Sequence, residues 1–172
     1  FMQKTYLCID LKSFYASVEC VELGLDPFKV NLVVADPTRG GGAITLAATP
    51  AIKKLGVSSR GRIFEIDPKI EYMITPPRMH LYMEYSCKVY KVFLEFIAKE
   101  DIHVYSIDES FLDITSYLKL YQVSAKELAK KILDRIYEKT GLTATVGIGT
   151  NLYLAKIAMD ISAKHNADRI AY

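Results

Sequence analysis

The hydrophobic positions at the start of the chain form one short run followed by an amphipathic stretch. Residues 5–9 are mostly apolar and end at Asp10, which predicts a buried strand that delivers a carboxylate at its end. Over residues 13–23, apolar side chains recur at helical spacing before a glycine and a proline, so we expect a helix there. The predicted order is therefore strand, carboxylate, helix.

The next stretch predicts a small lobe of short elements. Residues 30–35 and 43–48 are two β-type runs joined by a glycine-rich segment, which predicts a hairpin with a mobile tip. Thr49 and Pro50 predict a short helix, because a capping residue precedes a proline in the first turn. Residues 57–80 are rich in proline, arginine and glycine without clear periodicity, so we expect irregular structure.

The second half of the chain alternates helical and strand patterns. These predict a helix over 85–96, strands at 103–107 and 111–114, a helix after the capping box Ser124-Ala-Lys-Glu127, a strand at 143–148, and a helix from Thr150 or Asn151 through Ile161. Apart from the lobe, this order indicates an α+β, ferredoxin-like fold with helices on one face of an antiparallel sheet.

Composition narrows the class of protein. The chain has 172 residues, of which 51% are hydrophobic and 24% charged, as expected for one globular domain or two small ones. Three cysteines without metal-ligand spacing favour a reducing cytoplasm. No apolar run is long enough to span a membrane, and we expect no membrane partner.

The charge is unevenly distributed. The net charge is only +2, but residues 37–64 contain basic side chains and no acidic one. This segment can present a positive surface to phosphate groups, although an ordinary solvated surface gives the same pattern.

The most specific chemical signal is the segment Ser106-Ile-Asp-Glu-Ser110 between two predicted strands. A hairpin here would place Asp108 at the open edge of the sheet, where a neighbouring strand can bring Asp10 beside it. Converging carboxylates repel one another unless cations neutralise them, and their oxygens suit Mg²⁺ or Mn²⁺. Two such ions can promote phosphoryl transfer. Taken alone, the acidic pair is equally typical of a polar turn, and Asp10 of a helix cap.

A second signal begins at Gly147-Ile-Gly149. It starts like a dinucleotide-binding fingerprint, but Leu152 replaces the third glycine, so we exclude a dinucleotide site. Lys156 follows one turn into the predicted helix and is suited to a triphosphate oxygen. A solvated lysine is the alternative.

Three segments together resemble the signature motifs of Y-family DNA polymerases, nearest the UmuC-like (ImpB/MucB/SamB) branch. They are Asp10-Leu-Lys-Ser-Phe-Tyr-Ala-Ser-Val-Glu19, Ser106-Ile-Asp-Glu-Ser-Phe-Leu-Asp113, and Val146-Gly-Ile-Gly-Thr-Asn151 with Leu154-Ala-Lys156. The resemblance implies a polymerase palm from residues 1–21 and 80–172 and an inserted α/β fingers lobe at 22–79. We expect thumb and little-finger domains outside this chain, making it an N-terminal catalytic fragment with weak or no activity alone.

The resemblance implies template-directed translesion synthesis in DNA repair, damage tolerance and the SOS response. The implied partners are a DNA primer-template and deoxynucleoside triphosphates, with a sliding clamp reached through regions outside this chain. The implied cofactors are two Mg²⁺ ions, or Mn²⁺, held by Asp10, Asp108, Glu109 and the Leu11 carbonyl.

The resemblance also implies a nucleotide-binding set. Tyr15 would be the steric gate that excludes a ribose 2′-hydroxyl, with Phe14 beside it, although both are equally typical of core aromatics. Lys156 would contact the triphosphate. In the fingers motif, where relatives place a tyrosine and an arginine, this chain has Pro50 and Lys53. Lys53 keeps the charge without the bidentate geometry of arginine.

Two other functions are compatible with the sequence. A nucleotide cyclase shares the palm fold and the carboxylates but lacks the Phe14-Tyr15 pair. A degenerate palm that serves as a regulatory or DNA-binding module fits the missing fingers tyrosine, although all the acidic residues are present.

Overall fold

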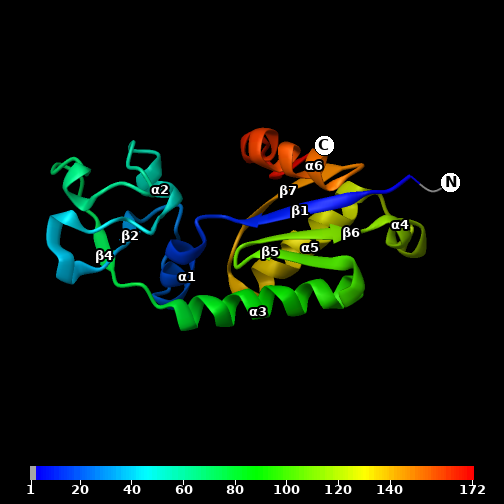
Figure 1. The fold of residues 1–172 in the computed structure, drawn as a ribbon, viewed down its shortest axis with the longest axis horizontal. Coiled ribbons are helices and arrows are strands. Elements are labelled where there is room, and N and C mark those ends of the chain that lie inside the picture. The colour runs from blue at the N-terminus through cyan, green and yellow to red at the C-terminus, as the bar shows by residue number, and fades with distance from the viewer. Residues whose placement is uncertain (1–2) are drawn as a thin grey trace. The chain divides into compact units, whose positions relative to one another are not determined.

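A computed structural model describes residues 3–172. The chain forms two compact units: the first combines the residues up to Leu11 with Tyr85–Tyr172, and the second comprises Lys12–Glu84. Helix α3 (Met79–Phe96) contributes to both units. Figure 1 labels the elements of each unit.

The first unit contains a five-stranded sheet in the order β5-β6-β1-β7-β8. The strands are β1 (Tyr6–Leu11), β5 (Ile102–Ser106), β6 (Glu109–Asp113), β7 (Ala144–Gly149) and β8 (Ile170–Ala171). The central strand β1 pairs antiparallel with both β6 and β7, whereas short β8 is parallel to β7. Without β8, the order β5-β6-β1-β7 is ferredoxin-like, so the predicted α+β class is confirmed.

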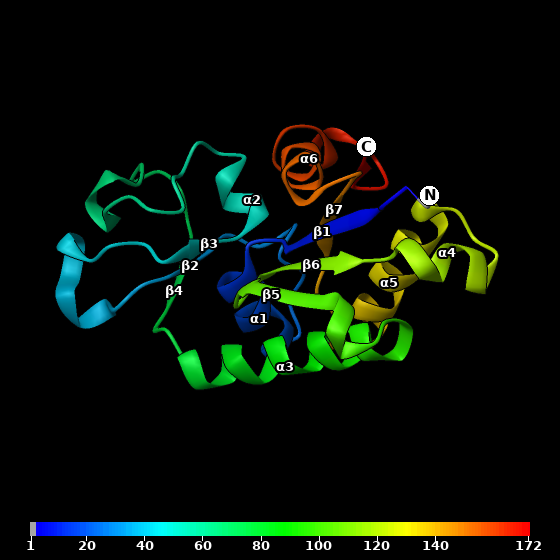
Figure 2. The same cartoon turned by 45° about the vertical axis from the view of Figure 1, so that its right-hand side comes forward.

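Helices cover both faces of this sheet. The part of α3 after Tyr85 packs against the face that carries Ile9 and Leu11, and α5 (Ala125–Thr140) is joined to α3 by the ion pair between Arg135 and Glu95. Figure 2 shows α3 and α6 on opposite sides of the sheet. Helix α6 (Leu152–Ile157) instead packs on Cys8 and Phe111. The prediction of helices on one face therefore holds for α3 and α5 and is wrong for α6. Because side chains alternate along a strand, the face that carries Cys8 and Phe111 is also apolar, and α6 shields it from water.

Three elements of the structure were not predicted. Helix α4 (Thr115–Tyr121) follows β6, and the two-residue strand β8 lies near the end of the chain. Strand β4 (Met73–Thr75) lies within the stretch expected to be irregular, so that expectation is wrong there. None of the helices formed by residues 3–172 is long and apolar enough to cross a membrane.

The second unit is built on a three-stranded sheet in the order β3-β2-β4. Strand β2 (Leu32–Val34) pairs antiparallel with β3 (Ala47–Ala48), which confirms the predicted hairpin, and parallel with β4. The short helix α2 (Pro50–Lys53) begins as predicted, because the Thr49 hydroxyl accepts the Ile52 backbone N–H.

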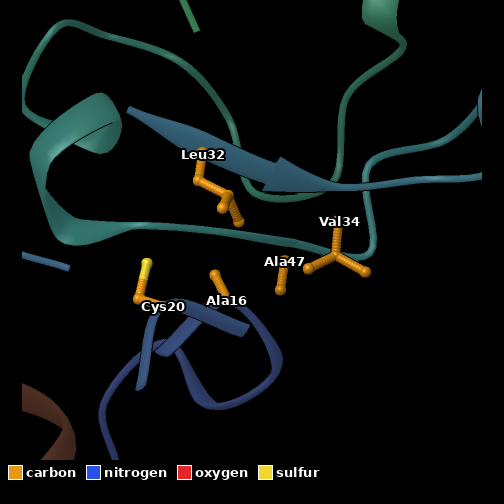
Figure 3. Packing of buried hydrophobic residues seen from close by; sticks show 5 residues of the cluster. All are labelled: Ala16, Cys20, Leu32, Val34 and Ala47. Carbon is orange, nitrogen blue, oxygen red and sulfur yellow. The ribbon is translucent and has the colours of Figure 1, made fainter. Parts of the chain in front are cut away.

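Helix α1 (Phe14–Glu22) packs on this small sheet. Figure 3 shows the contact, in which Ala16 and Cys20 of the helix face Leu32, Val34 and Ala47 of the strands. The small side chains of the helix allow the close approach, and Tyr15 packs at the edge of the same cluster. The sheet therefore supports the helix that carries the two aromatic residues of the first motif.

Candidate active site

The register of β1 and β6 brings the predicted acidic residues to one end of the sheet. Asp10 lies directly opposite Glu109, and the backbone N–H of Leu11 donates to the Asp108 carbonyl at 2.9 Å. The Ser106 hydroxyl donates to the Asp108 carboxylate, also at 2.9 Å. Asp10 thus lies beside Asp108 and Glu109, which are remote from it in sequence, because β1 pairs with the second strand of the hairpin.

The side chains at this end of the sheet are not arranged around a common centre. Among residues 3–172, no group of three or more histidine, cysteine, aspartate or glutamate side chains is placed to hold a metal ion. Glu109 instead forms an ion pair with Lys156 at 2.5 Å and accepts a hydrogen bond from the Cys8 thiol at 3.4 Å. Lys156 also contacts Asp160 at 3.5 Å.

Asp10 has an unfavourable electrostatic environment. Burial and the nearby charges of Asp108 and Glu109 raise the pKa of Asp10 to about 7, with Lys156 opposing the shift. Burial raises the pKa of the Cys8 thiol, and the adjacent Glu109 charge adds to the effect. Lys156 is paired with Glu109, and its charge only partly offsets the effect of the neighbouring carboxylates on Asp10.

This donor set fits a hard divalent cation. Carboxylate oxygens are the ligands that Mg²⁺ and Mn²⁺ prefer, and a bound cation would offset the repulsion that raises the pKa of Asp10. Glu109 would have to exchange its contact with Lys156 for such an ion. The chemistry of the donors therefore supports a metal site, and metal ligation by Asp10, Asp108, Glu109 and the Leu11 carbonyl stays a prediction.

Two glycines position Lys156. A Cβ atom on Gly147 would lie 2.0 Å from the Ala155 carbonyl oxygen, and one on Gly149 would lie 2.4 Å from the Ala155 nitrogen. Strand β7 therefore contacts the backbone of α6 directly, which requires glycine at both positions. The same packing brings Lys156 to Glu109. The two glycines therefore serve the packing of α6 on β7 rather than the binding of a dinucleotide phosphate.

Sequence reasoning did not anticipate the surroundings of Lys156. Burial alone would lower its pKa, but the hydrogen bond and charge of Glu109 raise it above the ordinary value. The ammonium group also lies 5.6 Å from the centre of the Tyr105 ring, a cation–π distance. The alternation of residues in β5 indicates that Tyr105 faces one side of the sheet, but which side it faces depends on the register between β5 and β6.

The aromatic residues of the first motif form a stack in the second unit. The Tyr15 and Tyr82 rings lie 4.4 Å apart and are nearly parallel, at 14°. Phe14 is buried with its ring 5.7 Å from that of Tyr15. Tyr82 was missed, although it lies one helical turn before Tyr85 and extends the same apolar stripe.

The fingers motif is a capped helix in this chain. Pro50 is buried in the first turn of α2, and Lys53 lies in the last turn. Pro50 thus has a structural role at the start of the helix, and contact between Lys53 and a nucleotide stays a prediction. Of the basic residues between Pro37 and Phe64, Arg62 donates to the Gly42 carbonyl at 2.6 Å.

The sheet order, with acidic residues at the end of β1 and at the turn of the β5–β6 hairpin, defines a polymerase-type palm domain. The chain belongs to the impB/mucB/samB family, which it matches over residues 9–160. It thus belongs with the Y-family polymerases that the signature motifs resemble, and the predicted order of elements in the sheet agrees with the observed fold.

Curated relatives share this similarity over nearly the whole chain. UvrX of Bacillus subtilis (strain 168) is 41% identical over 174 residues, which cover 99% of this chain and 40% of that protein. DNA polymerase IV 2 of the same organism is 40% identical over 172 residues, which cover 98% of this chain and 40% of that protein. The chain therefore spans about 40% of the length of these relatives.

Solved structures show the same fold. DinB from Sulfolobus solfataricus superimposes with a TM-score of 0.78 and 29% identity, covering 97% of this chain and 47% of that chain. An insertion ternary complex of Dbh DNA polymerase gives a TM-score of 0.78 at 28% identity, covering 97% and 48%.

Proposed function

We propose that this chain provides the catalytic palm and fingers of a DNA-directed DNA polymerase that acts in translesion synthesis. The palm would comprise residues 1–21 and 80–172, and the fingers residues 22–79. The observation that carries the proposal is the position of Asp10 opposite Glu109 on paired strands, with Asp108 in the adjoining turn, where the charges of Asp108 and Glu109 raise the pKa of Asp10. Family membership and the DNA polymerase names of the relatives support the choice of reaction.

Each site residue has a role in this proposal. Asp10, Asp108, Glu109 and the Leu11 carbonyl hold two divalent cations. Cations held by these residues would supply activation of the primer 3′-hydroxyl and stabilisation of charge on the leaving pyrophosphate. Lys156 leaves Glu109 to neutralise a triphosphate oxygen, which its ammonium group can do as a point charge.

The remaining nucleotide contacts come from the second unit. Tyr15, with Phe14 beside it, excludes the 2′-hydroxyl of a ribonucleotide, and Lys53 binds a phosphate. By the same family membership we expect two Mg²⁺ ions, a DNA primer-template and a deoxynucleoside triphosphate as partners. A cytoplasmic location, the SOS response and contact with a sliding clamp through other parts of the protein belong to this proposal.

The two alternative readings have less support. A nucleotide cyclase does not explain the match to the impB/mucB/samB family over residues 9–160. A degenerate palm would have no reason to keep the partly buried Asp10 among other carboxylates, because such a charge costs stability without a ligand.

The decisive experiment is primer extension by the full-length protein with the substitution Asp108→Ala. We expect nucleotide insertion to fall by about 10³-fold or more, because several kcal/mol of transition-state stabilisation depend on the metal ligands. DNA affinity should change little, since the carboxylate does not contact the duplex. Asp134→Ala, at an exposed position of α5, is the matched control and should insert nucleotides normally. Retained insertion by Asp108→Ala would exclude this carboxylate as a metal ligand.

The role of Tyr15 is tested separately by Tyr15→Ala. Removing the ring should raise the efficiency of ribonucleotide insertion relative to deoxynucleotide insertion by about 10²-fold, because the steric exclusion is lost. Unchanged sugar selection would show that another residue is the gate.

A further inference from the structure

A hydrogen-bond and ion-pair network around the buried carboxylate of Glu19 lies near the Tyr15 ring in the second unit. The Tyr82 hydroxyl donates to Glu19 at 2.6 Å, and Arg78 donates to the same carboxylate through Nε at 3.2 Å and through a terminal nitrogen at 2.6 Å. Tyr82 is fully buried, and Glu19 is only 2% exposed. The carboxylate of Glu19 therefore has three donors, which satisfies a charge that would otherwise be costly to bury.

Tyr15, Glu19, Arg78 and Tyr82 together join two segments of the chain. Tyr15 and Glu19 are four residues apart on α1, so they lie on one face of the helix. Arg78 directly precedes α3, and Tyr82 follows it by four residues. The Tyr15–Tyr82 stack and the bonds to Glu19 thus connect α1 to the start of α3 at two successive positions.

The hydrogen bond restrains the orientation of the Tyr82 ring. Burial, together with the hydrogen bond to Glu19, raises the pKa of Tyr82 above its usual value, so its hydroxyl remains a donor. The Tyr15 ring is nearly parallel to this restrained ring, at 14°, and is itself only partly buried. The position of Tyr15 is consequently set on one side by Tyr82.

We propose that Glu19, Arg78 and Tyr82 are positioning residues for sugar selection, which act by holding the Tyr15 ring rigidly enough to exclude a 2′-hydroxyl. The inference rests on the proposed function of Tyr15 as the steric gate. A gate rejects a ribonucleotide by steric overlap, and a ring that can retreat by a fraction of an ångström relieves that overlap. The rigidity of the ring then matters as much as its size.

The test compares insertion of dCTP and rCTP by the full-length protein carrying Tyr82→Phe or Glu19→Gln. Tyr82→Phe removes one oxygen and keeps the ring, and Glu19→Gln keeps the shape of the side chain and removes its charge. We expect the dCTP/rCTP ratio of kcat/KM to fall about fivefold in each variant, the effect of one lost hydrogen bond. A purely structural role would lower both efficiencies together and leave the ratio unchanged.

Tyr117→Phe is the matched control. Tyr117 is another buried tyrosine whose hydroxyl donates to a carboxylate, Asp101, at 2.6 Å, and it belongs to the first unit. The dCTP/rCTP ratio of kcat/KM in Tyr117→Phe should stay at the wild-type value. In a Tyr15→Ala background, Tyr82→Phe should cause no further loss, because the residue through which it acts is gone.

The outcomes separate this inference from the proposed function. If Tyr15→Ala reduces the ratio while Tyr82→Phe and Glu19→Gln do not, the positioning role is wrong and the gate stands. If Tyr15→Ala leaves the ratio unchanged, the gate assignment is wrong and the positioning role is overturned with it.

A measurement without catalysis provides an independent check. Fluorotyrosine at position 15 should give one sharp ¹⁹F resonance in the wild type and in Tyr117→Phe, and a shifted or broadened resonance in Tyr82→Phe and Glu19→Gln. An unchanged resonance in the last two variants would overturn the inference regardless of activity.

Discussion

Each of the two units contains a carboxylate that is shielded from water, buried in the case of Glu19 and partly buried in the case of Asp10, and their environments are opposite. Glu19 in the second unit receives hydrogen bonds from Arg78 and Tyr82. Asp10 in the first unit lies near Asp108 and Glu109, and its pKa rises to about 7. A buried charge with partners contributes to a fixed structure, whereas a buried charge among like charges lowers stability and indicates a ligand. The comparison distinguishes a positioning carboxylate from a ligand-binding one within a single chain.

The largest expected loss of stability is that of Glu19→Gln. Removing this charge leaves Arg78 without its partner, and breaking a well-buried pair costs about 3–5 kcal/mol. Because the Arg78 side chain is 51% exposed, water compensates part of the loss, and we expect about 2 kcal/mol. Urea denaturation measures the change. Glu138→Gln, which removes an exposed ion pair with Arg135, is the control and should cost less than about 0.5 kcal/mol. Equal effects in the two variants would contradict the importance of the buried network.

Asp10→Asn should change stability in the opposite direction. The pKa of Asp10 is about 7 in the folded state, and about 3.9 when unfolded. The folded state therefore binds more protons between these values, so the wild type loses stability as the pH rises from about 4 to about 7. With allowance for partial exposure, the metal-free variant should be about 2 kcal/mol more stable than wild type at pH 8.

The same substitution should have no benefit at pH 3.5, where Asp10 is protonated in both states. Denaturation curves in the presence of a chelator at the two pH values measure this difference. A variant that is less stable than wild type at pH 8 would show that the Asp10 charge is already compensated within the protein.

Added Mg²⁺ should produce the smallest of these effects. At ten times its dissociation constant, a ligand that binds only the folded state adds about 1.4 kcal/mol to the free energy of unfolding. We expect this gain in the wild type and its loss in Asp10→Asn, while Glu19→Gln should keep it. Denaturation with and without Mg²⁺ measures the gain. An equal gain in all three proteins would place the cation elsewhere.

Features that depend on a few neighbouring residues were predicted correctly from the sequence. The caps at Thr49 and Ser124 were predicted from residue type, and the last helix was expected to begin at Thr150 or Asn151, of which Asn151 is the cap. Each of the three side chains accepts a backbone N–H three residues later. Asp10 was placed beside the acidic hairpin because strand patterns flank both segments, and the register confirms this pairing. Rejection of a dinucleotide site from Leu152 agrees with the packing role of Gly147 and Gly149.

The features that were missed depend on contacts between distant segments. Strand β4 has three residues, and its pairing with β2 follows from tertiary structure rather than from periodicity. The position of α6 on the second face of the sheet depends on Cys8 and Phe111 meeting across strands. The bond from Tyr82 to Glu19 joins two helices, and nothing in the spacing of either helix indicates its partner.

The central position of β1 has a consequence for how the protein is made. Tyr6 pairs on one edge with Asp113 and on the other with Gly149, so β1 is synthesised long before β7, the strand that covers its second edge. Contacts of such high sequence separation form late and slowly. Until β7 has been synthesised, the buried strand β1 has an open edge, which is a site for aggregation. A nascent chain that stalls between β6 and β7 should therefore depend on chaperones more than the finished protein does.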